Sequence, residues 1–578
     1  MTQQRISPAF ARRASCPAAV IAGPAGAHRA AVTRAPLTVR LLIASTVAVA
    51  ALAAVAAPVR AQAPFRLAPT DAAYADLDRL AAAGLIDSAI AGQRGLSRSE
   101  VALLVARARA SAAQPGPRGV NAATAEALER MEARVHRDLA AERSARPIDA
   151  GVDGVDLTLA HSGSAPRMVP ADTGLGGVDA TIDPLTLTGR QGRDELRGSS
   201  IGIEAGIWLR MGSHLAVEAR PRFRAGTEPS VLREPTVSWQ SLVGRFQAGN
   251  VVFSIGREYL TWGTARHGGL FLSDNAPPLD LISIASDRPF SLPGPLGRLG
   301  PTRTIVFGSD LGARQVFPHS MLLGYKVSVA PAPRLELGVS VLDFTGGEGA
   351  PRATALKRVE HFLAFPVLPL KGFQFSNQMA GIDLRYRMAG RRGATVYWEM
   401  NLDDFDVRRL DGVLWRDDAA QLVGVRVPAI TPDGRVGVTA EIHHTGTRFG
   451  RHLQFQSGAT RDGRLLGDPL GPDADGAYAF VDLDPGPRTH VSVAVAAEAY
   501  RADQYVIASQ DPFVIRRTGS RPQERRTRAV LSWRRQSAGA RAWFELQGGL
   551  ERVAQFAFSE GPARTSGMAA AVLHWSLR

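Results

Sequence analysis

The sequence predicts a mainly β protein, a large antiparallel transmembrane β-barrel of about 18 strands preceded by a small α-helical domain. Apolar and polar residues alternate with a period of two over most of the chain after Pro147. An apolar export segment ends near residue 57. No later segment approaches the roughly 18 consecutive apolar residues of a membrane helix. If the exported chain spans a membrane, it must therefore do so with strands.

Residues 1–61 predict a signal peptide with an upstream extension. The stretch 41–57 is uncharged and rich in alanine and other apolar residues, which is the pattern of a secretory signal. Val59-Arg60-Ala61 fits the small-x-small rule, so we expect Sec export and cleavage before Gln62. An uncleaved membrane anchor is the alternative, although the stretch is slightly short for spanning.

The net charge of +14 does not predict a nucleic-acid-binding protein. Residues 1–61 contain seven arginines and no acidic residue, so the charge falls to +7 without them. The other basic residues are scattered, whereas phosphate tracking requires a cluster. Arginine contacts to lipopolysaccharide phosphates at a barrel rim explain the arginine content, and so does a GC-rich genome. Cys16 is the only cysteine, which excludes disulfides and thiolate metal sites from the exported chain.

Residues 62–147 predict a small helical periplasmic domain. Ser97 and Glu100 have the spacing of a capping box at the start of a second helix, and Asn121 is a candidate N-cap for a third. Three apolar stripes at helical spacing support this assignment: Tyr74, Leu77 and Leu80; Val101, Leu104 and Val105; and Leu128, Met131, Val135 and Leu139.

Residues 74–87 and 96–104 resemble one S-layer-homology-like helical repeat. Such repeats bind cell-wall polymer, so contact with peptidoglycan or with periplasmic export proteins is one interpretation. A purely structural helical domain is the other.

Residues 148–578 predict the barrel itself. Tight turns such as 211–214 and longer loops such as 461–476 are typical of outer-membrane barrels, and roughly 24 residues per strand and connection give about 18 strands. A soluble propeller or a string of sandwiches is the alternative, but neither a blade-length repeat nor a dividing linker is present. Clear two-residue alternation is seen at 215–222, 335–341, 396–402 and 543–547.

One block stands out among the predicted strands. It consists of Phe253-Ser-Ile-Gly-Arg-Glu-Tyr-Leu-Thr-Trp-Gly263 followed by His267-Gly-Gly-Leu-Phe-Leu-Ser-Asp-Asn-Ala-Pro-Pro278. The block resembles the core motif of the Wzi-type capsule assembly family, and stretches at 323–338, 377–383 and 466–473 agree in order. The residues that match the motif are Gly256, Arg257, Trp262, Gly263, Ser273, Asn275 and Pro277.

The resemblance implies an outer-membrane barrel of about eighteen strands with a periplasmic helical bundle. It also implies a lectin that retains capsular polysaccharide, or another envelope polysaccharide, at the cell surface. It implies neither catalysis nor a cofactor.

Five residues of the block are candidate sugar contacts, because aromatic rings and planar polar groups suit carbohydrate. They are Tyr259, Trp262, His267, Asp274 and Asn275. The alternative is a buried turn at Trp262 and Gly263, with Asn275 satisfying backbone inside the lumen. Neighbouring Arg257 and Glu258 predict a structural ion pair in a polar lumen.

Two other functions stay open at this point. Barrel size alone suggests a diffusion porin. A barrel hydrolase needs only a serine, a histidine and an orienting side chain from separate strands, although no Gly-x-Ser-x-Gly motif is present. Glu441-Ile-His-His444 lacks the His-Glu-x-x-His spacing and lies in a strand pattern, so no metal site is predicted.

Overall fold

The structure is a computed structural model of the chain. The predicted signal peptide, residues 1–61, and the expected cleavage before Gln62 lie outside the described residues. Those residues are 63–577, without 88–89, 115–119, 143–145, 165, 172, 183–190, 194–197, 228–234, 365–374, 389–392, 404–418, 511–512 and 538–540.

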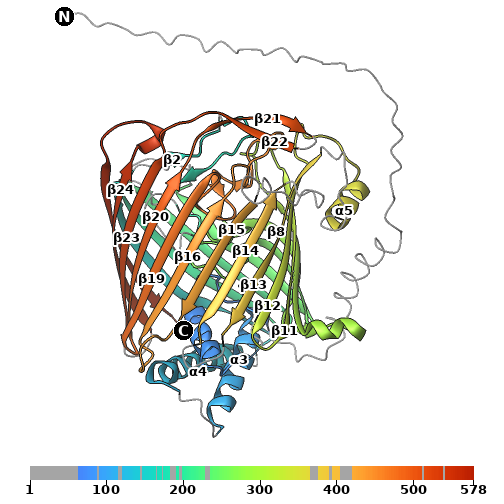
Figure 1. The fold of residues 1–578 in the computed structure, drawn as a ribbon. Coiled ribbons are helices and arrows are strands. Elements are labelled where there is room, and N and C mark those ends of the chain that lie inside the picture. Colours follow the sequence, from blue (N-terminus) through green and yellow to red (C-terminus); the bar gives the residue numbers. More distant parts are fainter. Residues whose placement is uncertain are drawn as a thin grey trace, which may run out of the picture.

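One large sheet closes on itself to form a barrel (Figure 1). Strand β1 (Ile148–Ser162) pairs antiparallel with β4 (Gly198–Met211) on one side. On its other side it pairs antiparallel with β25 (Arg564–Ser576), the last strand of the chain. Closure leaves no open sheet edge at this seam, as a membrane-spanning sheet requires.

Eighteen strands make up the wall within the described residues. The sheet has 19 strands, but short β9 (Phe290–Ser291) and β8 (Leu279–Ser286) pair with the same strand, β10 (Pro301–Asp310). The prediction of about 18 strands is confirmed. The other wall strands are β5 (Leu215–Gly226), β6 (Val237–Ala248), β7 (Val251–Glu258), β11 (Met321–Ala332), β12 (Leu335–Thr345), β13 (Ser376–Arg387), β14 (Thr395–Asp403), β15 (Ala419–Val427), β16 (Val436–Thr445), β19 (Ala474–Gly486), β20 (Thr489–Tyr500), β23 (Glu524–Gln536) and β24 (Ala542–Ala554).

The wall turns its apolar side chains outward. In β12, Leu337 and Val339 are 36% and 40% exposed, whereas Glu336 and Ser340 are 4% and 1% exposed. This reverses the burial expected of a water-soluble protein, and it is the arrangement of a barrel whose outer face contacts lipid. Among the described residues, no helix has the length and apolar character needed to span a membrane.

The two ends of the barrel differ. Short connections such as the predicted 211–214 turn lie at the end that carries the helices, which we call the helix end (Figure 1). Longer connections lie at the opposite end, the loop end. The predicted loop at 461–476 is wrong at its C-terminal end, because β19 already begins at Ala474. The loop-end connections contain β2 (Arg167–Met168), β3 (Thr181–Ile182), β17 (Thr460–Arg461), β18 (Arg464–Leu465), β21 (Gln504–Gln510) and β22 (Phe513–Gly519).

Three helices gather at the helix end, as predicted: α2 (Ala73–Ala82), α3 (Arg98–Ala112) and α4 (Ala122–Glu142). Asn121 caps α4 by accepting the backbone N–H of Thr124 at 2.8 Å. Whether this domain contacts peptidoglycan stays a prediction. The apolar stripes meet in a shared core that includes Leu77, Leu80, Val101, Leu104, Val105, Leu128 and Met131.

Only half of the predicted capping box forms at the start of α3. The Ser97 hydroxyl accepts the Glu100 N–H at 3.2 Å. The Glu100 carboxylate instead forms a buried ion pair with Arg303 of β10. Glu100 therefore fastens the helical domain to the barrel wall instead of completing the capping box.

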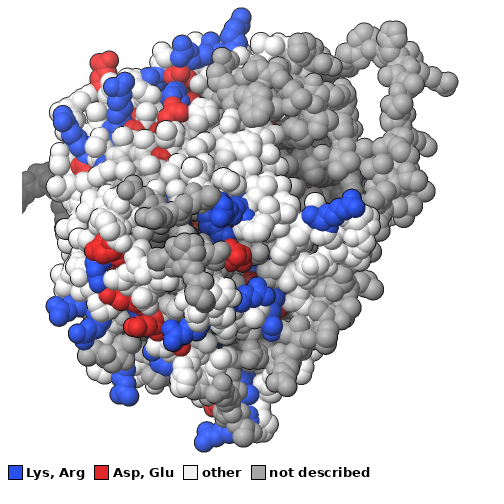
Figure 2. Space-filling view, turned by 60° about the horizontal axis from the view of Figure 1, so that its bottom comes forward, with Lys and Arg blue, Asp and Glu red and all other residues white. Residues whose placement is uncertain are grey.

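Further ion pairs join the helices to the turns of the barrel. Arg435 lies 2.6 Å from Glu126 of α4, and Asp484 lies 2.5 Å from Arg79 of α2. Figure 2, with the helix end turned forward, shows basic and acidic side chains next to one another on this face. Charge pairing across many side chains thus holds the helical domain in one position.

Candidate functional site

The family-like block begins at β7 and continues into loop 259–278, which joins β7 to β8 at the loop end. The loop folds back into the barrel lumen. Gly263 N–H donates to the Gly92 carbonyl at 2.9 Å, and Trp262 forms a β-bridge with Gln93. Residues 92 and 93 belong to the helical domain, so segments from the two ends of the barrel meet inside it.

Two more loop-end connections join this contact. The Asn275 side chain donates to the Leu465 carbonyl at 2.9 Å, and Ser273 N–H donates to the Leu466 carbonyl at 2.8 Å. The Asp274 carbonyl accepts the N–H of Gly192 at 3.0 Å. We call loop 259–278 together with these partner segments the plug.

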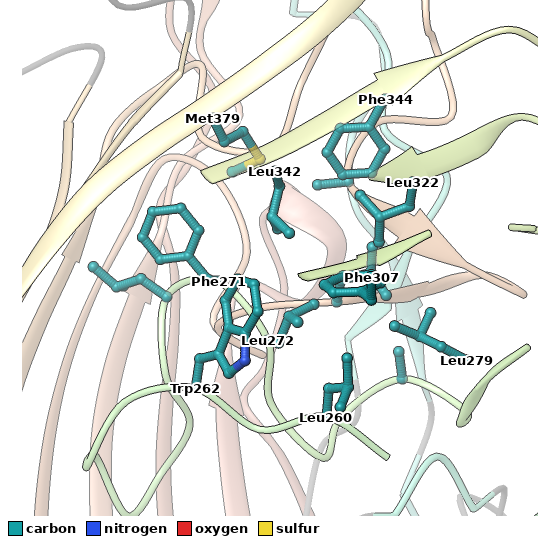
Figure 3. Close-up of a cluster of buried hydrophobic side chains, with 14 of the residues drawn as sticks. Leu260, Trp262, Phe271, Leu272, Leu279, Phe307, Leu322, Leu342, Phe344 and Met379 are labelled. Carbon is teal, nitrogen blue, oxygen red and sulfur yellow. The ribbon is translucent and has the colours of Figure 1, made fainter. Parts of the chain in front are cut away.

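An apolar core packs the plug against wall strands β8 and β10–β15. Trp262 packs edge-on against Phe307 of β10, with ring centroids 5.7 Å apart. Figure 3 shows Trp262 and Leu272 of the loop among wall side chains that include Phe307, Leu342 and Met379. A conducting porin has a polar, water-filled lumen, whereas here the side of the lumen next to β8 and β10–β15 is packed like a protein interior. Polar side chains such as Arg220 of β5, 40% exposed, remain on the other side.

A buried glutamate of β14 holds the start and the end of the inserted turn. The Glu399 carboxylate accepts the backbone N–H of Thr264 at 3.0 Å and that of Leu270 at 3.2 Å. Gly263 has a φ of +97°, and a side chain there would collide with Glu399. The motif glycine lets the loop backbone approach the wall carboxylate.

A second buried glutamate, from β16, holds the tip of the same turn. Glu441 accepts the N–H of Arg266 at 2.6 Å and the N–H of His267 at 3.0 Å. The Tyr397 hydroxyl donates to the same carboxylate at 2.5 Å. Charge-assisted bonds of this kind are stronger than neutral ones, and they satisfy backbone donors buried in the lumen.

His443 fastens another part of the plug. It lies two positions after Glu441 in β16, so both side chains face the lumen. Its Nδ1 lies 2.5 Å from Asp468, which belongs to the connection between β16 and β19. Sequence reasoning did not assign this role to Glu441-Ile-His-His444. The available signal was the pair of polar residues at positions i and i+2 of one strand.

The structure separates the five predicted sugar contacts into two groups. Trp262, His267 and Asn275 are 3%, 1% and 2% exposed and lie inside the plug. Tyr259 and Asp274 are partly exposed, and the Tyr259 hydroxyl donates to Gln240 at 2.7 Å. Burial favours the structural interpretation for the first three, and contact of the other two with sugar stays a prediction.

The remaining motif residues also have defined positions. Gly256 and Arg257 lie near the loop end of β7, and Pro277 lies just before β8. The Ser273 hydroxyl donates to the Gly467 carbonyl at 2.7 Å. The motif therefore encodes how the plug is built into the wall.

The predicted Arg257–Glu258 ion pair is wrong. Neighbouring residues of a strand point to opposite faces of the sheet. Arg257 instead pairs with Asp280 at 2.6 Å. Glu258 pairs with Arg245 at 3.0 Å, and both of these side chains are buried.

The loop end carries a junction that the sequence did not single out. Tyr505 N–H of β21 donates to the Thr173 carbonyl at 2.9 Å, and its hydroxyl donates to Asp473 at 3.1 Å. Three loop-end connections therefore meet at one partly exposed aromatic ring. Arg517 of β22 lies beside it and pairs with Asp503 at 3.0 Å. We call Tyr505, Asp473, Asp503 and Arg517 the Tyr505 junction.

Burial, together with the Asp473 carboxylate, raises the pKa of the Tyr505 phenol above its ordinary value. The phenol therefore stays protonated at physiological pH and keeps its proton as a hydrogen-bond donor. The partly exposed ring can stack on a sugar, and the exposed Arg517 guanidinium can hydrogen bond to its hydroxyl groups. Asp473 and Asp503 are buried and hold these two side chains in place.

The sequence profile of the capsule assembly protein Wzi matches residues 192–567, which is most of the barrel. The chain belongs to the Wzi capsule assembly family. Its outer-membrane location follows from this membership together with the lipid-type outer surface of the barrel. No curated protein matches the sequence.

One of the similar solved structures shows the same fold. Wzi of Escherichia coli, described as an outer membrane protein involved in group 1 capsule assembly and a carbohydrate-binding β-barrel, is 16% identical with a TM-score of 0.60. The match covers 88% of this chain and 98% of that one. OccAB1 of Acinetobacter baumannii is 9% identical over 74% of this chain and 97% of its own, with a TM-score of 0.40. OprD of Pseudomonas aeruginosa is 10% identical over 76% and 95%, with a TM-score of 0.39.

Proposed function

We propose that this Wzi-family barrel binds capsular or another envelope polysaccharide and retains it at the cell surface without catalysis. The observation that carries the proposal is the plug. Because the lumen is packed with side chains from both ends, the barrel offers a ligand its outer loop surface rather than a passage. The carbohydrate-binding Wzi of Escherichia coli, which has the same fold, supports this assignment.

The loop end is the face that would meet exported polysaccharide. Outer-membrane barrels place short turns in the periplasm and long loops outside. The helix end has the short turns, so the helical domain is assigned to the periplasm. The predicted signal peptide, with predicted cleavage before Gln62, is consistent with export.

The Tyr505 junction is the proposed sugar contact at the loop end. It combines an aromatic ring with planar charged groups, which is the chemistry that recognises sugar rings and their hydroxyl groups. Partly exposed Tyr259 and Asp274 extend the candidate set toward the plug. Both lie within the family-like block, beside residues that match the motif.

Cell-bound polysaccharide in a deletion strain provides the test. Loss of polysaccharide into the medium, restored by the wild-type gene, is expected; unchanged retention would overturn the proposal. Tyr505→Ala should restore retention poorly, and Tyr505→Phe should restore most of it because the ring face remains. Tyr386→Ala, at an exposed tyrosine on the outer wall, is the matched control and should behave like wild type.

Planar-bilayer recording separates this function from that of a diffusion porin. The plugged lumen predicts no large steady conductance from the purified barrel. A steady conductance comparable to that of open porins would favour the porin.

A further inference from the structure

A short helix lies outside the barrel wall near the loop end (Figure 1). This helix, α5 (Ala355–Ala364), belongs to the connection between β12 and β13. Its Phe362 packs edge-on against Tyr325 of β11, with ring centroids 5.3 Å apart, and also contacts Val341 of β12. Val341 lies two positions from exposed Val339, so α5 covers the face of the wall that otherwise contacts lipid.

Polar side chains of the wall explain why the helix lies there. Asp343 and Gln378 are paired neighbours in β12 and β13, and Asp343 shares the outer face with Val341 because it lies two positions further on. His361 of α5 lies 2.7 Å from the Gln378 amide and 3.2 Å from the Ser376 hydroxyl. Without α5 these polar groups would face hydrocarbon, where they are costly.

The opposite side of α5 carries large apolar side chains, with Glu360 four positions after Leu356, and has no protein cover in the described structure. Leu356 is 76% exposed, the highest value for a large apolar side chain among the described residues, and Val359 is 49% exposed. At 100° per residue, Leu356 lies opposite the midpoint between His361 and Phe362. In water such a helix would expose its apolar side chains, whereas at the level of the outer wall it meets lipid.

Basic residues accompany this apolar side. Lys357 follows Leu356 directly and is exposed, and Arg352, just before the helix, is exposed as well. An apolar face flanked by long basic side chains is typical of helices that lie in a membrane interface, with the charged groups reaching toward anionic headgroups.

We propose that α5 inserts into the outer leaflet as an interfacial helix, with Leu356 and Val359 among lipid acyl chains and Lys357 and Arg352 against lipopolysaccharide phosphates. Strand β11, against which Phe362 packs, also carries exposed Met321 on its lipid-facing side. This site is separate from the Tyr505 junction and does not depend on polysaccharide binding. It anchors the connection between β12 and β13 to the membrane.

Spin labels on single cysteines test the position of α5. Because Cys16 is the only native cysteine, a Cys16→Ser background of the full chain accepts one label at a time. Leu356→Cys is compared in liposomes containing lipopolysaccharide with two reference sites. Ile282→Cys lies on the exposed outer wall, and Leu453→Cys is exposed at the loop end.

We expect the label at position 356 to match the wall reference, with high oxygen accessibility and low accessibility to a water-soluble nickel chelate. Accessibility like that of the loop-end reference would place α5 in water and overturn the proposal. Protection from both reagents would indicate contact with a second copy of the chain and would overturn it as well.

The phosphate contact has its own test. In the labelled Leu356→Cys protein, Lys357→Glu should raise nickel accessibility in liposomes that contain lipopolysaccharide. It should have little effect in liposomes of phosphatidylcholine alone. An equal effect in both lipids, or no effect in either, would overturn the assignment of Lys357 to the phosphates.

Discussion

The imidazole ring of His267 lies flat against the ring of Tyr478, with centroids 3.7 Å apart and planes inclined by 18°. His267 belongs to the inserted loop and Tyr478 to wall strand β19. The stack therefore joins the plug to the wall on the side away from Trp262. Because only two side chains form this stack, replacing one of them measures how much the contact stabilises the plug.

Replacing His267 with alanine should loosen the tip of the plug. Aromatic pairs contribute about 0.5–1.5 kcal/mol beyond the area that they bury, so the N–H groups of residues 264–272 should exchange hydrogen several-fold faster. Hydrogen exchange followed by mass spectrometry measures this. His267→Phe keeps the stack and should exchange more slowly than His267→Ala; equal exchange in the two variants would show that the ring contact contributes nothing.

Removing the Glu441 carboxylate should release the same turn more strongly. Glu441→Ala leaves three buried donors without their acceptor, and each such loss costs about 1–3 kcal/mol. We expect trypsin added to liposomes to cleave after Arg266 and brief channel openings to appear in planar bilayers. Glu441→Gln keeps one carbonyl acceptor, so its rate of cleavage and its frequency of channel openings should lie between those of wild type and Glu441→Ala. A Glu441→Ala variant that resists trypsin and shows no channel openings would contradict the role of Glu441 in holding the turn.

Gly263→Ala should lower the temperature at which the folded barrel loses its fast migration on gels. The added methyl group would collide with Glu399 at a backbone φ of +97°. Gly212→Ala is the matched control, because Gly212 also has a positive φ, +62°, but lies in open space. We expect a larger fall in this temperature for Gly263→Ala, because of the collision. An equal fall in both variants would show that backbone strain alone causes it.

The Glu100–Arg303 pair should show strong coupling between the helical domain and the wall. Breaking a buried pair by removing one partner costs about 3–5 kcal/mol, whereas replacing both partners with apolar residues costs less. Glu100→Leu alone should make α3 accessible to proteases, and adding Arg303→Met should reverse part of this. A double variant as open as the sum of the two single changes would contradict direct coupling.

Acid should loosen the packing of α4 on α2 through Asp71. Burial alone would raise the pKa of Asp71, but Arg134 and the Ala73 N–H outweigh burial and hold that pKa below its ordinary value near 3.8. A carboxyl group whose pKa is lower in the folded protein stabilises the fold at pH values above its pKa in the unfolded chain, about 3.9. This stabilisation is lost as the pH falls through the pKa of the folded protein. Protection of α4 N–H groups from exchange, corrected for intrinsic rates, should therefore fall below about pH 4 in wild type. Asp71→Asn should remove this step.

The strands and helices could be predicted because their periodicity is local. At 335–341 the alternation records which side of the wall each residue occupies, and the burial of Glu336 beside exposed Leu337 confirms it. The stripes of α2, α3 and α4 record one shared core. The family-like block around Trp262 was identified correctly, and its placement inside the lumen was one of the two interpretations.

The plug partners and α5 could not be predicted in the same way. Gly92 and Gly263 are far apart in the sequence, and no pattern along the chain states that they share a hydrogen bond inside the lumen. The Tyr505 junction combines residues from two connections and contacts a third through the Thr173 carbonyl. Helix α5 was not predicted because its ten residues, Ala355–Ala364, are too few for periodicity to be clear.

The seam between β1 and β25 has a consequence for how the molecule is made. The wall is closed by its first and last strands, but its two ends stay open to segments of the same chain. Loop 259–278 enters through one end and residues 92–93 through the other, and they meet at Trp262 and Gln93. This meeting needs the full curvature of the wall, so an error in joining β1 to β25 should appear inside the lumen as a lost contact between the two ends.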